Sequence, residues 1–267
     1  MLDTADIRRL ADELDHARKH VATVRQLSLR HPHMTVADAY AVQSAWVERM
    51  LADGRRIVGR KIGLTSMPMQ RSMGISEPDY GVITDDMVFD NGGAIPWDRF
   101  TFPRVEIELA FVLAERLAGP GIGAADVLRA TSFISPSIEV LDSRVEMTDP
   151  GSGHRRTIVD TISDNAANAG LVVGPGTLDP RDLRPRDLSA LLYINGVIEE
   201  SGVASAVLGN PAQAVAWLAN RLGAYGQALA AGEVILSGSL TQSIPVSRGD
   251  VVHGEFGALG AVTCRFV

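Results

Sequence analysis

The chain has 267 residues, of which 46% are hydrophobic and 21% are charged, as in an ordinary globular protein. This length allows one large domain or two small ones with a sizeable buried core. Lysine and arginine total 25 against 32 aspartates and glutamates, so the formal net charge is -7 and excludes a broad positive surface for nucleic acid. An anionic substrate would therefore need a metal ion or local basic groups in its pocket.

The cysteine content and the N-terminus favour a reducing compartment. The single cysteine, Cys264, cannot form an internal disulfide and lies in an apolar stretch that favours a buried strand. The N-terminus lacks the basic-then-apolar order of a signal peptide, and no run approaches the ~18 apolar residues of a membrane span. We therefore expect a soluble, cytoplasmic protein without a membrane partner.

Helical signals dominate residues 1–56. The segment from Asp6 to His20 is charged and contains Ala and Leu, and a second helix is marked by Thr35 as N-cap with Asp38 three residues later. This second helix is expected to stop at Gly54. Its apolar residues recur at spacings of three and four, which creates one stripe that must pack against the rest of the protein.

From Ile57 onward, short apolar or alternating runs are separated by Gly, Pro and Asp, which is typical of strands and turns. One clear helix interrupts them, with Asn210 as N-cap, Pro211 as first helical residue and Gly223 as stop. The final strands are separated by segments too short for crossover helices, which favours antiparallel or mixed pairing. We predict an α+β fold in which the N-terminal helical region precedes a mixed β-sheet barrel or roll, the catalytic domain, at residues 57–267.

Two glutamates stand out in the predicted strand from Arg104 to Leu113. Glu106 and Glu108 are two residues apart, so both carboxylates point to the same side and repel each other unless a cation lies between them. The alternative is that both lie on the solvated face of a half-exposed strand. Spacing alone does not decide between these two interpretations.

A third acid favours the metal site. Glu139 has apolar neighbours that suggest burial, and an unpaired buried carboxylate is costly. Three carboxylates without His or Cys suit a hard cation, Mg²⁺ or Mn²⁺, and leave coordination positions open for water and substrate. A 2-oxo acid is the natural chelator, because its carboxylate and 2-oxo oxygen can bind the same ion.

Other polar residues allow two interpretations each when they are taken alone. Lys61 on a predicted strand is more simply an outward, solvated lysine, and Asp79 is by composition a turn residue. The segment 237–243 offers hydroxyl and N–H groups for a substrate carboxylate, although an ordinary turn explains it equally well. Asn165 and Asn168 are more simply helix caps than residues that close a pocket.

Several other site types are disfavoured. The six histidines lack metal-ligand spacing, and the sequence contains neither the lysine-containing P-loop nor the Gly-x-Ser-x-Gly elbow of acyl transfer. Cys264 has no evident partner base, so nucleophilic catalysis is not expected. The tryptophans, including Trp46 and Trp217 on amphipathic helices, are most simply packing residues.

The segment from Arg104 to Phe111 resembles the metal-binding strand of the fumarylacetoacetate hydrolase superfamily, with Glu106, Glu108 and Glu139 in the ligand positions. The resemblance covers nearly the whole chain. Motifs similar to those of the hydratase and decarboxylase branch occupy residues 61–66, 75–81, 160–170 and 195–203. His33 departs from this pattern, because an acidic residue is expected at its position, and the role of that loop stays open.

The resemblance implies a fold of the fumarylacetoacetate hydrolase type and a metal-dependent hydratase. It implies addition of water to a small 2-oxo dicarboxylic acid, 2-oxohept-4-ene-1,7-dioate, in aromatic (homoprotocatechuate) meta-cleavage catabolism. Proton transfers are assigned to Lys61 and Asp79, and substrate contacts to Ser163, Ser239 and Thr241. The resemblance also implies a homo-oligomer, a decamer built from pentamers.

Four alternatives stay open. Hydration of 2-hydroxypenta-2,4-dienoate and decarboxylation of 4-oxalocrotonate would use the same metal site, whereas a hydrolase would need a base such as His31 or His33 near the metal. A non-catalytic assembly subunit would hold a structural ion or none. The partner of a distal substrate carboxylate is also undecided among Arg71, Arg155 and Arg156.

Overall fold

The computed structural model describes residues 1–73 and 75–267. Its helices are α1 (Thr4–His20), α2 (Leu27–Arg30), α3 (Val36–Ala52), α4 (Met67–Met73), α5 (Ala124–Ala130), α6 (Ile158–Ser163) and α7 (Pro211–Gly223). Its strands are β1 (Ile57–Gly63), β2 (Asp79–Thr84), β3 (Val88–Phe89), β4 (Ala94–Ile95), β5 (Arg104–Leu113), β6 (Thr131–Leu141), β7 (Asn168–Val173), β8 (Ser189–Ile194), β9 (Val197–Val203), β10 (Val234–Ser239), β11 (Ile244–Pro245), β12 (Val251–Glu255) and β13 (Ala261–Phe266).

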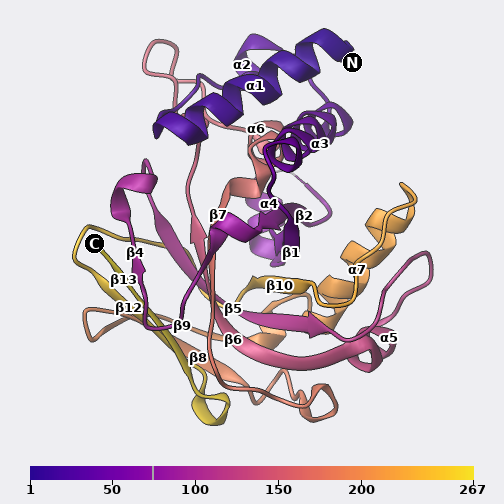
Figure 1. The fold of residues 1–267 in the computed structure, drawn as a ribbon, viewed down its shortest axis with the longest axis vertical. Helices are drawn as coiled ribbons and strands as arrows, with labels where there is room; N and C mark the ends of the chain where they lie inside the picture. The colour runs from indigo at the N-terminus through magenta and orange to yellow at the C-terminus, as the bar shows by residue number, and fades with distance from the viewer. Residues whose placement is uncertain (74) are drawn as a thin grey trace.

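The described strands form two sheets (Figure 1). The eight-stranded sheet has the order β2-β1-β10-β5-β6-β7-β3, with β11 paired to β5, and the five-stranded sheet has the order β4-β13-β12-β8-β9. Most neighbours are antiparallel, but β1 and β10, β3 and β7, and β4 and β13 are parallel. The predicted α+β class with mixed strand pairing is therefore confirmed.

Most of the predicted helix starts and stops agree with the structure. α3 begins after Thr35, which forms a capping box with Asp38, and α7 begins at Pro211 after the N-cap Asn210. α3 ends at Ala52, two residues before the predicted stop. The short helices α2, α4, α5 and α6 were not predicted, because four to seven residues are too few to display a helical period.

Strand β5 is buried on both faces, and each face meets a different part of the molecule. Val105, Ile107 and Leu109 belong to a core shared with the second sheet and α7. Ala110 on the other face packs in a second core with Trp46 of α3 and Leu236 of β10. Because side chains alternate along a strand, Glu106 and Glu108 lie on the same face as Ala110. The helices α1 and α3 lie at one end of the molecule in Figure 1.

A buried amide ties the N-terminal helices to the large sheet. Gln43 of α3 donates hydrogen bonds from Nε2 to the carbonyl oxygens of Tyr80 in β2 at 2.9 Å and of Ile162 in α6 at 3.0 Å. Tyr80 belongs to the first core and Val82 to the second, so both cores meet at β2. The proposed boundary between residues 56 and 57 stays a prediction. No helix within residues 1–73 and 75–267 combines the length and apolar character that a membrane crossing requires.

Replacing Gln43 with Leu should lower the free energy of unfolding by about 1–3 kcal/mol, because two buried carbonyl groups would lose their donor. Urea denaturation of the whole chain measures this change. Glu48→Leu on the exposed face of α3 is the matched control and should leave stability nearly unchanged. An unchanged midpoint for Gln43→Leu would show that the amide does not hold the helices in place.

Candidate active site

Three glutamates meet on two neighbouring strands. Glu106 and Glu108 lie two residues apart on β5, and the antiparallel register places Glu139 of β6 directly opposite Glu106. Directly opposed residues have Cβ atoms about 5 Å apart. One carboxylate oxygen from each glutamate lies within 4.8 Å of the other two. The structure thus brings together the three residues that the sequence predicts as metal ligands.

All three glutamates are buried, with exposed fractions of 9% for Glu106, 1% for Glu108 and 0% for Glu139. The alternative in which Glu106 and Glu108 lie on a solvated strand face is therefore wrong. Burial raises the pKa of Glu106 to about 8, and repulsion from Glu139 adds to the shift. Burial also raises the pKa of Glu108 and of Glu139. The cluster would be stabilised by added positive charge.

Two neutral donors hold the glutamates in place. Asn168 at the start of β7 donates from Nδ2 to Oε1 of Glu139 at 2.8 Å, and the backbone N–H of Gly238 donates to Oε2 of Glu108 at 2.7 Å. The other oxygen of Glu139, Oε2, has no hydrogen-bond partner among the described residues. One carboxylate oxygen of Glu139 therefore has no donor among the described residues.

Gly238 occupies a position that only glycine fills without strain. Its φ is +110°, and a Cβ atom there would lie 2.3 Å from Oγ1 of Thr65. This conformation aims its N–H at Glu108, a contact that the sequence analysis missed because Ser237-Gly238-Ser239 has the composition of an ordinary turn.

Lys61 of β1 supplies the positive charge closest to the cluster. Its Nζ lies 3.4 Å from Oε1 of Glu139, and only 4% of the residue is exposed, so the interpretation as a solvated lysine is wrong. Burial opposes the ammonium charge, but Glu139, Asp79, Glu106 and Glu108 together raise the pKa of Lys61. The carboxylates around Lys61 therefore favour its charged form.

Asp79 lies next to Lys61 rather than in an exposed turn. It begins β2 opposite Gly63 of β1, and a Cβ atom at Gly63 would lie 2.2 Å from Oδ1 of Asp79 and 3.2 Å from Nζ of Lys61. Gly63 therefore makes room for both polar groups. Burial raises the pKa of Asp79, and Oδ1 has no hydrogen-bond partner among the described residues. A buried carboxyl with one oxygen unpaired and a raised pKa suits proton transfer.

The three predicted substrate-binding residues are placed differently. Ser239 of β10 lies opposite Glu108, and its hydroxyl donates to the carbonyl of Thr241 at 2.7 Å. Oγ1 of Thr241 is buried without a partner among the described residues. Ser163 at the end of α6 donates to the carbonyl of Val159 at 2.8 Å, and no described contact joins it to the glutamates. A substrate role for these three residues stays a prediction.

The side chains of the two asparagines do not cap a helix, although Asn168 is the C-cap residue of a short 3-10 helix, Asn165–Ala167, through its backbone N–H. Asn165 bonds both the N–H and the carbonyl of Val82 in β2, while Asn168 bonds Glu139. The histidines do not join the cluster either: Nε2 of His31 faces Arg9 at 3.4 Å, and the described carboxylate cluster contains no histidine. The geometry that would favour a hydrolase is therefore not found at His31.

A cavity of about 160 Å³ adjoins Asp79. It lies between α3, α6 and the segment before β2, and is lined by Val36, Tyr40, Ile75, Ser76, Glu77, Pro78, Asp79, Ile158 and Ile162. Its walls are mainly apolar, and Asp79, which adjoins Lys61, is one of its polar lining residues. A larger hollow of about 290 Å³ under α1 touches the cluster region through Asn168.

The family model described as fumarylacetoacetate (FAA) hydrolase C-terminal matches residues 57–267. The chain belongs to this family. Among curated proteins it is similar to the 2-oxo-hept-4-ene-1,7-dioate hydratase of Escherichia coli, with 50% identity over 97% of each chain. It is 38% identical to the 2-hydroxyhexa-2,4-dienoate hydratase of Comamonas testosteroni over 100% of this chain and 99% of that protein.

Solved structures of family members show the same fold. The 4-oxalocrotonate decarboxylase of Pseudomonas putida G7, complexed with magnesium and adipate, superposes with a TM-score of 0.94 at 32% identity and covers 100% of this chain and 99% of its own. A second structure of that decarboxylase is complexed with calcium and acetate. The predicted family, branch and fold type are thus confirmed, including the N-terminal helices that precede the family domain.

Removal of divalent ions should make the stability of the chain depend on pH. Burial raises the pKa of Glu106 from 4.5 to about 8, so the folded state binds more protons than the unfolded state across that interval and stability falls as the pH rises. We expect the melting temperature in chelator to drop by at least about 3 °C across this range. Mg²⁺ should restore it more at the alkaline end, and a flat profile in chelator would contradict the buried-carboxylate account.

Replacing Gly238 with Ala should weaken Mg²⁺ binding by about 10- to 100-fold, because the N–H that orients Glu108 would move. Gly232→Ala is the matched control: its φ is +85°, but a Cβ there would meet nothing within 4 Å. Calorimetric titration should show loss of affinity only for Gly238→Ala. Equal losses in the two variants would point to backbone strain alone.

Proposed function

We propose that the chain is a divalent-metal-dependent hydratase that converts 2-oxohept-4-ene-1,7-dioate to 4-hydroxy-2-oxoheptanedioate in homoprotocatechuate meta-cleavage catabolism. The observation that carries this proposal is the buried cluster of Glu106, Glu108 and Glu139 beside Lys61 and Asp79. The 50% identical hydratase and the other diene hydratases among its relatives support the reaction type.

The residues present fit a hard divalent cation, Mg²⁺ or Mn²⁺. Three buried carboxylates converge without His or Cys among the described residues, and Oε2 of Glu139 is free to bind an ion. Bound there, the ion would polarise the 2-oxo group of the substrate and stabilise negative charge that develops on its oxygen. Mg²⁺ is supported by the magnesium complex of the decarboxylase relative.

The reaction needs four proton or hydroxyl transfers. A proton leaves C3 and one is added at C5, which moves the double bond to C3–C4; a water hydroxyl then adds at C4, and C3 regains a proton. Asp79, with its unpaired oxygen and raised pKa, is suited to accept and return protons. Lys61 keeps its proton, because nearby carboxylates raise its pKa, and its charge stabilises the oxygen at C2.

Hydroxyl groups on β10 and after it are suited to hold the C1 carboxylate. Ser239 lies opposite Glu108, and the buried Oγ1 of Thr241 has no partner among the described residues. Ser163 is the third residue proposed to contact substrate; its hydroxyl donates to Val159, so only its oxygen remains to accept a hydrogen bond. We further propose that the protein acts in the cytoplasm as a homo-oligomer, a decamer by family resemblance.

Two sister activities share this site. Decarboxylation of 4-oxalocrotonate is supported by the TM-score of 0.94 to the decarboxylase, and hydration of 2-hydroxypenta-2,4-dienoate by a relative 40% identical over 84% of this chain. The greater identity to the seven-carbon diacid hydratase favours the proposed substrate. A non-catalytic assembly subunit is disfavoured, because burial of the charged groups of Lys61 and Asp79 is costly and packing alone does not require it.

Mass analysis of products tests the proposal. Incubation with 2-oxohept-4-ene-1,7-dioate should add one water, only when Mg²⁺ is present, and faster than the five-carbon dienoate is hydrated or 4-oxalocrotonate loses carbon dioxide. Glu106→Ala should lower turnover by more than about 100-fold, whereas Glu115→Ala, on the exposed segment after β5, should leave it unchanged. Turnover retained by Glu106→Ala would contradict the metal site, and preference for a rival substrate would reassign the activity within the family.

A further inference from the structure

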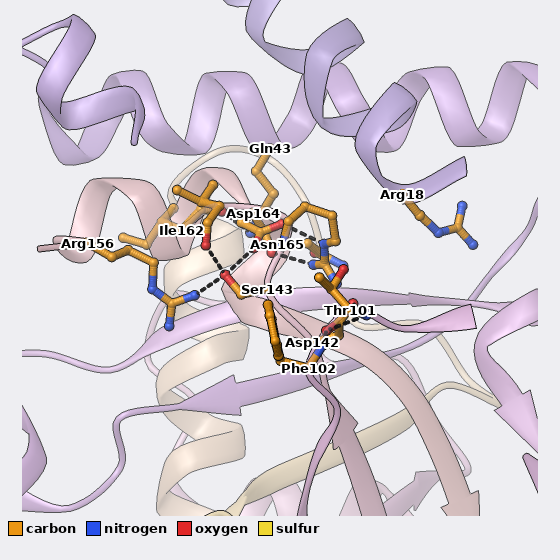
Figure 2. Close-up of polar contacts among 12 residues, drawn as sticks. Arg18, Gln43, Thr101, Phe102, Asp142, Ser143, Arg156, Ile162, Asp164 and Asn165 are labelled. Carbon is orange, nitrogen blue, oxygen red and sulfur yellow. Dashed lines mark hydrogen bonds and ion pairs between the residues drawn. The ribbon is translucent and has the colours of Figure 1, made fainter. Parts of the chain in front are cut away.

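Arg156 is a partly buried cation near the site that has no carboxylate partner. Its Nη1 donates to Oγ of Ser143 at 2.5 Å. Among the described residues, the Arg156 side chain makes no other hydrogen bond. No carboxylate oxygen of the described chain lies within 4.0 Å of its guanidinium. Desolvation lowers its pKa, although a guanidinium stays charged at neutral pH. Figure 2 shows the guanidinium directed toward Ser143.

The two aspartates nearest in sequence are committed to other donors. Asp164 accepts from Nε of Arg144 at 2.6 Å and from the Arg144 backbone N–H at 2.9 Å. Asp160 accepts from the N–H and hydroxyl of Ser28 and from the N–H of Thr157. Asp164 and Asp160 attract Arg156 from a distance and Arg144 repels it, but neither aspartate forms an ion pair with it within 4.0 Å. The guanidinium fork of Arg156 therefore keeps donors available for an added anion.

Arg156 lies near enough to Asp79 for the two charges to act on each other. Lys61 contacts Glu139, Asp79 adjoins Lys61, and the positive charges of Lys61 and Arg156 both act to lower the raised pKa of Asp79. The apolar cavity beside Asp79 is walled by Ile158 and Ile162 of α6, the helix that begins two residues after Arg156. Arg156 does not itself line the cavity, but a carbon chain that runs through it along Ile158 comes to the start of α6, two residues from this cation.

We propose that Arg156 binds the distal carboxylate of the substrate and so selects a 2-oxo dicarboxylic acid over a monocarboxylic one. This inference rests on the proposed function, and it names the specificity-determining residue of the same site. The chemistry is a guanidinium that pairs with a carboxylate, for which its planar fork is suited. Ser143 is a positioning residue, because its hydroxyl fixes one end of that fork.

The other arginines are less suited to this role. Arg71 and Arg155 are exposed. Arg221 lies near the cavity, but it has Oε1 of Glu77 at 3.8 Å and stacks over the rings of Tyr40 and Tyr225. Arg221 is thus the competing candidate, and its replacement belongs in the test.

The test measures binding of compounds that cannot be hydrated. Calorimetric titration of the full chain in Mg²⁺ compares 2-oxoheptanedioate, the saturated diacid, with 2-oxopentanoate, the saturated monoacid. Wild type should bind the diacid more tightly. Arg156→Gln should weaken diacid binding by about 10- to 100-fold and leave monoacid binding within about twofold, while Arg156→Lys retains part of the preference. Arg155→Gln should match wild type.

Loss of the preference in Arg221→Gln with its retention in Arg156→Gln would overturn the assignment, and so would equal losses for both ligands in Arg156→Gln. Unchanged monoacid binding shows that each variant is folded with its metal site intact. Because these ligands do not react, this binding test is independent of the proposed activity. Absence of turnover of the unsaturated diacid would refute the hydratase. Equal wild-type affinity for both saturated acids would instead refute the binding site for the distal carboxylate.

Discussion

The repulsion among three buried carboxylates is the constraint on which the site depends. Strand pairing between β5 and β6 fixes Glu106 opposite Glu139, and the period of the strand adds Glu108 on the same face. The packing of both sheet faces removes the water that would otherwise screen these charges. A fold that creates such a cluster needs a compensating cation, and Lys61 supplies only one positive charge.

The surrounding structure holds this charge in one geometry. Gly238 and Asn168 each donate to one glutamate, and Gly63 leaves space where Lys61 and Asp79 meet. These contacts come from six strands of one sheet, so the precision of the site comes from strand register. The helices complete the enclosure, because α3 and α6 cover the cavity that adjoins Asp79. Asp79 connects the two regions, because it adjoins Lys61 beside the glutamates and also lines this mainly apolar cavity.

The sequence predicted those parts of the fold and site that depend on local periodicity. Thr35 and Asn210 marked helix starts by capping chemistry, and alternation placed Glu106 and Glu108 on one face. The opposition of Glu139 could not be derived, because register depends on contacts distant in sequence. The contact of Gly238 with Glu108 was not predicted for a related reason: it requires a positive φ and a partner 130 residues away.

The most direct measurement of the metal site is anomalous diffraction from crystals grown with Mn²⁺. The account predicts one strong peak between Glu106, Glu108 and Glu139, with an oxygen of each carboxylate at about 2 Å and open positions facing Lys61 and the cavity. A peak elsewhere, an ion with a closed shell of protein ligands, or no peak at saturating Mn²⁺ would contradict the claim that the buried carboxylates form a catalytic metal centre.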